Sequence, residues 1–188
     1  MHDERSRENT AAARALNSNV RVAPSSSRML TSYLADIEQL LDEQQWEAAT
    51  REALDLPQIA VALSDMQLST TRERVKAWCD EWVRPEDPDR NARGADYERV
   101  SSNAVARVVQ EEGASIPSLA LKRLRLRRHA RTPPRGFSFD RNVNLGPEAN
   151  TAIDTCSILV EAARRWYAHS AVHDRTVQAN LARLAVLR

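Results

Sequence analysis

The chain is poor in glycine and in aromatic residues. Its 188 residues include 4 Gly, and Phe, Trp and Tyr together make up 5%. Because Ala, Leu, Glu and Arg are abundant instead, the composition favours helix over sheet and predicts an all-α protein. The sequence has no Gly-rich phosphate loop, and no Ser, Cys or carboxylate dyad stands out. We therefore expect neither a cofactor nor an enzymatic activity.

Long apolar runs are missing as well. No stretch approaches the ~20 apolar residues that a membrane helix needs, and the first residues, MHDERSRENT, lack the apolar region of a secretory signal. The two cysteines, Cys79 and Cys156, each lie in an amphipathic helical pattern, which predicts buried free thiols in a reducing compartment. We expect a soluble, cytoplasmic protein without a membrane partner.

Lysine is rare, and the charges are unevenly distributed. Among 27 cationic residues only Lys76 and Lys122 are lysines. Arginine makes bidentate contacts to phosphate, although GC-rich codons explain the same preference. Residues 36–112 carry 9 basic and 18 acidic side chains, whereas residues 113–188 carry 13 basic and 5 acidic ones. The basic half could therefore face a polyanion, or the two halves could attract each other between copies.

Hydrophobic periodicity predicts a helical bundle. Residues 1–25 are polar and predict a flexible arm, while residues 26–188 predict a single helical domain of the four-helix-bundle type with short satellite helices. Residues 85–94 predict a loop, and the alternation within residues 121–141 leaves a small hairpin open. The expected helix starts are Ser26 or Ser27, Ser69 or Thr70, Asp96, Gly146-Pro147 and about Asp174.

The most informative segment is the basic run KRLRLRRHARTPPR, residues 122–135, within a basic segment that extends to residue 141. The run contains 7 Lys or Arg and no acid. Each phosphate that a protein neutralises releases counterions, so such a run binds nucleic acid in a salt-dependent way. Phe137 and Phe139 follow, and aromatic planes stack on unpaired bases. The alternatives are a solvated charged face and a contact with another copy's acidic half. The candidate nucleic-acid-binding residues are Lys122, Arg123, Arg125, Arg127, Arg128, Arg131, Arg135 and Arg141.

Residues 105–128 also fit a helix-turn-helix motif. Gly113 would lie at the turn, and Leu119 would anchor a basic recognition helix. Glu112 and Lys122 fall where such motifs usually have apolar residues. A DNA-binding regulator is therefore an alternative, and a helical adaptor that binds another protein through the basic face is a third.

A histidine pair raises the question of a metal site. His169 and His173 are spaced so that one helical face could present both. No carboxylate or cysteine pattern completes a ligand set, so we interpret them as surface histidines and expect no metal.

Three stretches resemble a known family. They are LTSYLADIEQLL (30–41), TTRERVKAWCDEWVRP (70–85), and TAIDTCSILVEAARRW (151–166) followed by HDRTVQANLARL (173–184). Their order is similar to that in the coat proteins of rod-shaped plant RNA viruses of the tobamovirus, furovirus and benyvirus type. The chain departs from the family after Arg175, where Val177 and Gln178 replace Phe-Glu and the usual Trp beyond is missing.

The resemblance implies a four-helix bundle that stacks helically around single-stranded genomic RNA. It implies RNA rather than DNA as the bound nucleic acid, self-association, and a location in the virion or the host cytoplasm. Arginines near the inner end of the bundle would grip phosphates, which agrees with the candidates named from the basic run. The sequence thus predicts a self-assembling, coat-like structural protein that packages RNA.

Overall fold

The computed structural model describes residues 24–83, 90–111, 117–126 and 145–186. These residues form helices and no strand, so the all-α prediction is confirmed. No helix in this part of the chain is both long and apolar enough to cross a membrane. The elements in chain order are α2 (Pro24–Asp42), α3 (Trp46–Leu54), α4 (Leu56–Leu63), α5 (Arg72–Trp78), the π-helical turn η1 (Cys79–Val83), α6 (Arg90–Glu111), α7 (Pro117–Leu126), α8 (Pro147–Trp166), the π-helical turn η3 (Tyr167–Ala171) and α9 (Arg175–Val186).

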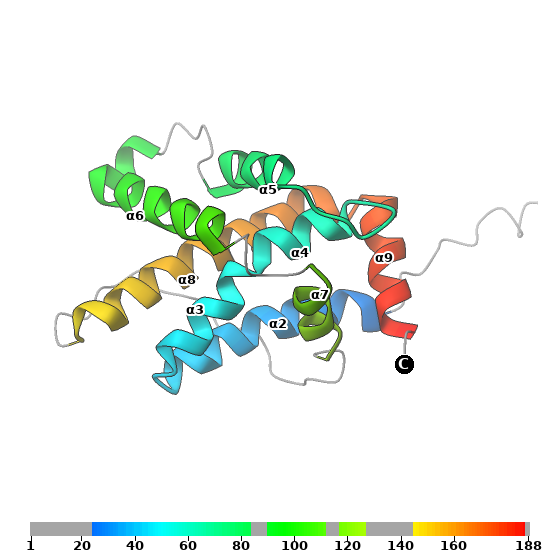
Figure 1. Cartoon of the computed structure of the whole chain (residues 1–188), viewed down its shortest axis with the longest axis horizontal. Helices are drawn as coiled ribbons and strands as arrows, with labels where there is room; N and C mark the ends of the chain where they lie inside the picture. Colours follow the sequence, from blue (N-terminus) through cyan, green and yellow to red (C-terminus); the bar gives the residue numbers. More distant parts are fainter. Residues whose placement is uncertain (1–23, 84–89, 112–116, 127–144, 187–188) are drawn as a thin grey trace, which may run out of the picture.

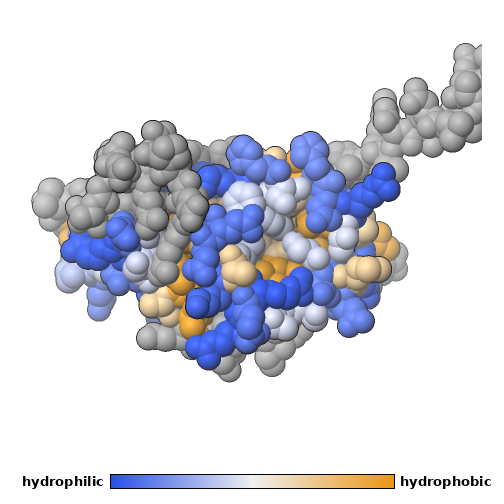
Figure 2. Space-filling view, turned by 90° about the horizontal axis from the view of Figure 1, so that it is seen from above, coloured by the Kyte–Doolittle hydropathy of each residue, from blue (hydrophilic) through white to orange (hydrophobic). Residues whose placement is uncertain are grey.

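Helix α8 forms the middle of the bundle. It runs along much of the molecule and packs against α2, α3, α4, α6 and η1 (Figure 1). Helix α2 lies alongside and packs against α3, α7 and α9. The core is built from the apolar faces of these helices, with fully buried side chains such as Tyr33, Ile59, Leu159 and Leu181. On the face shown in Figure 2, hydrophilic residues predominate and hydrophobic ones form small, separate areas.

Polar side chains connect helices where apolar packing alone would leave backbone groups without partners. The Tyr33 hydroxyl donates to the Glu52 carbonyl oxygen at 3.0 Å and so joins α2 to α3. The buried Asn180 side chain donates to the carbonyl oxygens of Leu63 at 3.0 Å and Asp65 at 2.8 Å. The last carbonyl oxygens of a helix have no partner within it, so Asn180 both satisfies the end of α4 and positions α9 on it.

Several predicted helix starts agree with the structure. Helix α8 begins with Gly146 as its N-cap and Pro147 in its first turn. The Asp174 carboxylate accepts hydrogen bonds from the backbone N–H groups of Thr176 and Val177, which explains the start of α9. Cys79 and Cys156 are buried free thiols, as predicted.

Other boundaries need correction. Helix α2 begins at Pro24, so the predicted arm does not include residues 24 and 25; residues 1–23 lie outside the described part of the chain. The cap of α5 is Thr71, whose side chain accepts from the Arg74 N–H at 3.4 Å, rather than Ser69 or Thr70. Helix α6 begins at Arg90, so the predicted loop is wrong for residues 90–94. Arg and Ala in that stretch are strong helix formers and outweigh the one Gly.

The hairpin prediction is wrong for residues 121–126, which form the last turns of α7. Leu121 and Leu124 lie one helical turn apart and both are buried, so the leucines follow the helical period rather than the alternation of a strand. The remainder of the hairpin, residues 127–141, lies outside the described residues.

The seating of α7 is testable with two leucines of the same helix. Leu124 is fully buried and Leu126 is 65% exposed. We expect Leu124→Ala to lower the free energy of unfolding by about 2–5 kcal/mol because it leaves a cavity. Leu126→Ala should change it by less than about 0.5 kcal/mol. Urea denaturation followed by circular dichroism measures both, and equal decreases would contradict the packing of α7.

Candidate functional site

The basic segment begins on a helix that the core holds in place. Helix α7 packs against α4 and α2 through Ala120, Leu121 and Leu124, all of which are buried (Figure 1). The same seating leaves Lys122 exposed and Arg125 half-buried. The first cations of the segment are therefore presented from a fixed helix.

Arg123 contributes to the packing of α7, a role that the sequence did not indicate. Its guanidinium forms an ion pair with Asp55, which lies at the junction of α3 and α4 and is 3% exposed. An ion pair with a buried carboxylate is hard to exchange for a phosphate, because the buried carboxylate would lose the compensating charge of the arginine. In the structure Arg123 therefore anchors α7, and its role as a nucleic-acid contact stays a prediction. Asp55 is far away in the sequence, so spacing could not have indicated this pair.

The structure brings only part of the predicted site together. Lys122 and Arg125 border a small hollow of about 240 Å³ with Leu121 and with Leu184 of α9. The remaining candidates lie outside the described residues, namely Arg127, Arg128, Arg131, Arg135 and Arg141. Of the predicted set, the described surface thus contains two cations available to an anion.

The packing does not support the helix-turn-helix alternative. Helix α6 packs against α8, α3 and α5, whereas α7 packs against α4 and α2. Leu119, the expected anchor of the recognition helix, is 46% exposed. The expected turn at Gly113 lies outside the described residues.

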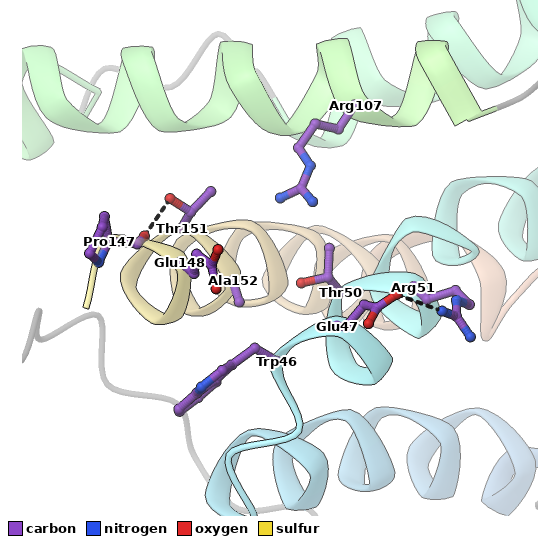
Figure 3. Close-up of a pocket in the computed structure, with 9 residues that line it drawn as sticks. All are labelled: Trp46, Glu47, Thr50, Arg51, Arg107, Pro147, Glu148, Thr151 and Ala152. Atoms are coloured by element: carbon purple, nitrogen blue, oxygen red, sulfur yellow. Dashed lines mark hydrogen bonds and ion pairs between the residues drawn. The ribbon is translucent and has the colours of Figure 1, made fainter. Parts of the chain in front are cut away.

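A second hollow, which the sequence did not indicate, lies between α3, α6 and α8. It has a volume of about 710 Å³ (Figure 3). Its lining combines an aromatic ring, hydroxyl groups, two arginines and two glutamates. The lining residues are Trp46, Glu47, Thr50, Arg51, Arg107, Pro147, Glu148, Thr151 and Ala152. They come from distant parts of the chain, and no motif connects them.

Arg107 differs from the other arginine of this pocket, Arg51, in its burial and in its partners. It is half-buried, and its guanidinium extends from α6 into the space above α3 and α8 (Figure 3). Nη1 donates to the Thr155 hydroxyl at 3.2 Å. Within the described ranges no carboxylate pairs with Arg107. By contrast, Arg51 at the rim pairs with Glu47 at 3.1 Å on the same helix.

The thiol of Cys156 lies close to the pocket but is not a candidate nucleophile. Burial raises the pKa of this thiol to about 12, and the Thr50 hydroxyl and the charge of Arg107 lower it by less. A thiol with such a pKa stays protonated at neutral pH, and the thiolate is the reactive form. Cys156 therefore serves as a small apolar core residue.

Two further arginines are structural. Arg164 of α8 forms an ion pair with Glu38 of α2, which is buried. Arg165 pairs with Glu161 at 2.8 Å and donates to the Trp82 carbonyl oxygen at 2.5 Å. Both arginines connect α8 to a neighbouring element and are committed to packing.

In the described residues no group of three or more His, Cys, Asp or Glu side chains could hold a metal ion. His169 lies in η3, and His173 follows it; both are exposed. Comparison with known protein families, with curated proteins and with solved structures gave no match.

The anchoring role of Arg123 gives a prediction that separates it from its neighbour. Arg123→Gln should lower the free energy of unfolding by about 1–3 kcal/mol, because the buried Asp55 carboxylate loses its contact with the positive charge of Arg123. Arg125 has no buried carboxylate beside it in the described part of the chain, so Arg125→Gln should change the same quantity by less than about 0.5 kcal/mol. Chemical denaturation of the two variants compares them directly. Equal stability of both would rule out the anchor.

Proposed function

We propose that this protein is a structural subunit that self-assembles and packages single-stranded RNA. The observation that carries the proposal is the seating of α7. Its buried leucines and Arg123 hold α7 on the core, while Lys122 and Arg125 face the surface at the start of the basic segment.

Because the basic segment begins on a fixed helix, it is suited to repeated contacts with the phosphate backbone of RNA. Phosphate contacts position a protein without reading sequence, and a run of arginines makes such contacts with any RNA. The segment continues with Arg127, Arg128 and Arg131 and contains no acid up to residue 135. Because its first residues are anchored, a ligand bound there would be held at a defined place on the bundle.

The charge distribution supports association between copies. At the corner between α2 and α3 the exposed side chains include Asp42, Glu43 and Glu47. Helix α9, at the other end of α2, exposes Arg175 and Arg183 (Figure 1). Opposite charges at opposite ends favour head-to-tail contacts, which extend into rings or filaments. A coat-like assembly of this kind would be found in the virion or in the host cytoplasm.

One observation favours a second function, that of a protein-binding adaptor. Leu119 and Leu126 are exposed on α7, on the same side as Lys122. A mixed apolar and basic helix face is a common docking surface for acidic partner helices. This function predicts binding to a protein and no binding to nucleic acid at any salt concentration.

RNA binding is tested by removing cations from the segment. The test variant replaces Arg125, Arg127 and Arg128 together by Ala. It should bind every single-stranded RNA more weakly and by a similar factor, because every RNA sequence has the same phosphate backbone. The plot of log affinity against log salt should become shallower by about 0.7 for each phosphate that the variant no longer neutralises. Fluorescence anisotropy with several labelled oligonucleotides measures both quantities.

The matched control removes the same charge elsewhere. The control variant replaces Arg51, Arg72 and Lys76 together by Ala. Its salt slope should equal that of the unmodified protein, since these three residues lie in the acidic half of the chain. If both triple variants bind RNA equally weakly, net charge rather than the segment governs binding.

Self-assembly is tested by electron microscopy of the purified protein with and without RNA. We expect extended or ring-like particles that become longer or more regular when RNA is present. Lys122→Glu together with Arg125→Glu should abolish the RNA effect by reversing the charge at α7. Monodisperse particles of 21.2 kDa under every condition would exclude the polymer.

A further inference from the structure

The proposed RNA contacts on α7 do not use the pocket between α3, α6 and α8. The main charged group of this pocket is the guanidinium of Arg107. A guanidinium carries five N–H donors, and in the described residues Arg107 directs one group, Nη1, at the Thr155 hydroxyl. Partial burial of a cation without a counter-charge costs free energy, so an anion that enters this space gains a partner and removes that cost.

The other walls of the pocket are suited to a flat apolar group. The indole of Trp46 lies across the space from Arg107, and Pro147 and Ala152 belong to the same lining (Figure 3). The hydroxyls of Thr50 and Thr151 already have protein partners, since Thr50 bonds to the Cys156 thiol and Thr151 donates to the Pro147 carbonyl oxygen, which leaves Arg107 as the main polar group for a ligand. A volume of about 710 Å³ lies within the range of roughly 300–1,000 Å³ that is typical of small-molecule sites.

Two acids in the lining restrict the charge of the ligand. Glu47 and Glu148 are both exposed at the pocket. A polyanion such as RNA would bring further phosphates close to these carboxylates, and like charges repel. A ligand with a single anionic group has to approach only Arg107.

We infer that this pocket binds a small organic anion with one carboxylate on a flat apolar ring system. The carboxylate pairs with Arg107, and the ring lies against Trp46. This inference does not rest on RNA binding, since no described residue of α7 lines the pocket.

The first test uses 2-naphthoate as the probe and 2-naphthamide as its neutral match, with the full-length protein in a calorimeter. We expect saturable binding of 2-naphthoate and at least about tenfold weaker binding of the amide, because only the acid makes a charge-assisted contact. Equal binding of the two compounds, or no saturable binding of 2-naphthoate at millimolar concentration, would overturn the inference. This comparison needs no variant.

Variants then locate the site. Arg107→Gln should weaken 2-naphthoate binding by about tenfold or more, and Trp46→Leu should weaken it by several fold. Arg183→Gln on α9 removes an exposed arginine of the same charge and should have no effect. Thermal unfolding provides the check on folding, and Arg107→Gln should retain the melting temperature because Arg107 forms no ion pair within the described residues. Equally weak binding by Arg107→Gln and Arg183→Gln would contradict a specific site.

RNA binding of Arg107→Gln separates the two proposals. We expect its salt slope to equal that of the unmodified protein. A shallower slope would assign Arg107 to RNA and overturn the small-ligand site. If no RNA binds at all while 2-naphthoate still binds, the packaging function fails and the pocket stands.

Discussion

Helix α8 packs against elements from all along the described chain, namely α2, α3, α4, η1, α6 and η3, and nearly every side chain in its middle turns is buried. Each neighbouring helix must therefore present an apolar face to it, and the area removed from water provides most of the stabilisation of the bundle. Ile158, Leu159 and Val160 are consecutive in the sequence and all buried. Three successive positions point in different directions around a helix, so α8 is surrounded by protein on most sides.

Apolar packing fits the helix faces together, and ion pairs add specific contacts between particular positions on neighbouring helices. Arg164 with Glu38 sets α8 against α2, and Arg123 with Asp55 sets α7 against the junction of α3 and α4. At the end of α4, Arg74 pairs with Asp65 at 2.8 Å. The pKa of Asp65 is lowered mainly by the hydrogen bond from the Gln67 backbone N–H and to a smaller extent by the hydrogen bond from Arg74. Each pair has a buried or half-buried member, so its partner is specified more strictly than that of an exposed charge.

The same distinction separates arginines that hold the fold from arginines that are available to a ligand. Arg123, Arg164 and Arg165 have protein partners in the interior. Lys122 and Arg125 lie at the surface at the start of the basic segment, and Arg107 faces a cavity in which no described carboxylate pairs with it. The proposed RNA contacts and the proposed anion pocket therefore use different parts of the molecule. The RNA contacts depend on many weak interactions with phosphates, and the anion pocket depends on a single half-buried guanidinium.

The sequence by itself determined the helical class, the burial of both cysteines and the starts of α8 and α9. These features follow from local causes: the period of apolar residues, a proline in a first turn, and an aspartate that caps backbone N–H groups. It also located the basic segment, because charge density is visible in the chain. Only the tertiary structure decided that Arg123 pairs with Asp55, that α7 packs against α4 and α2, and that Arg107, Trp46 and Thr151 line one pocket. These outcomes depend on which helices meet, and that choice is made by the fit of whole faces across distant segments, which no local pattern records.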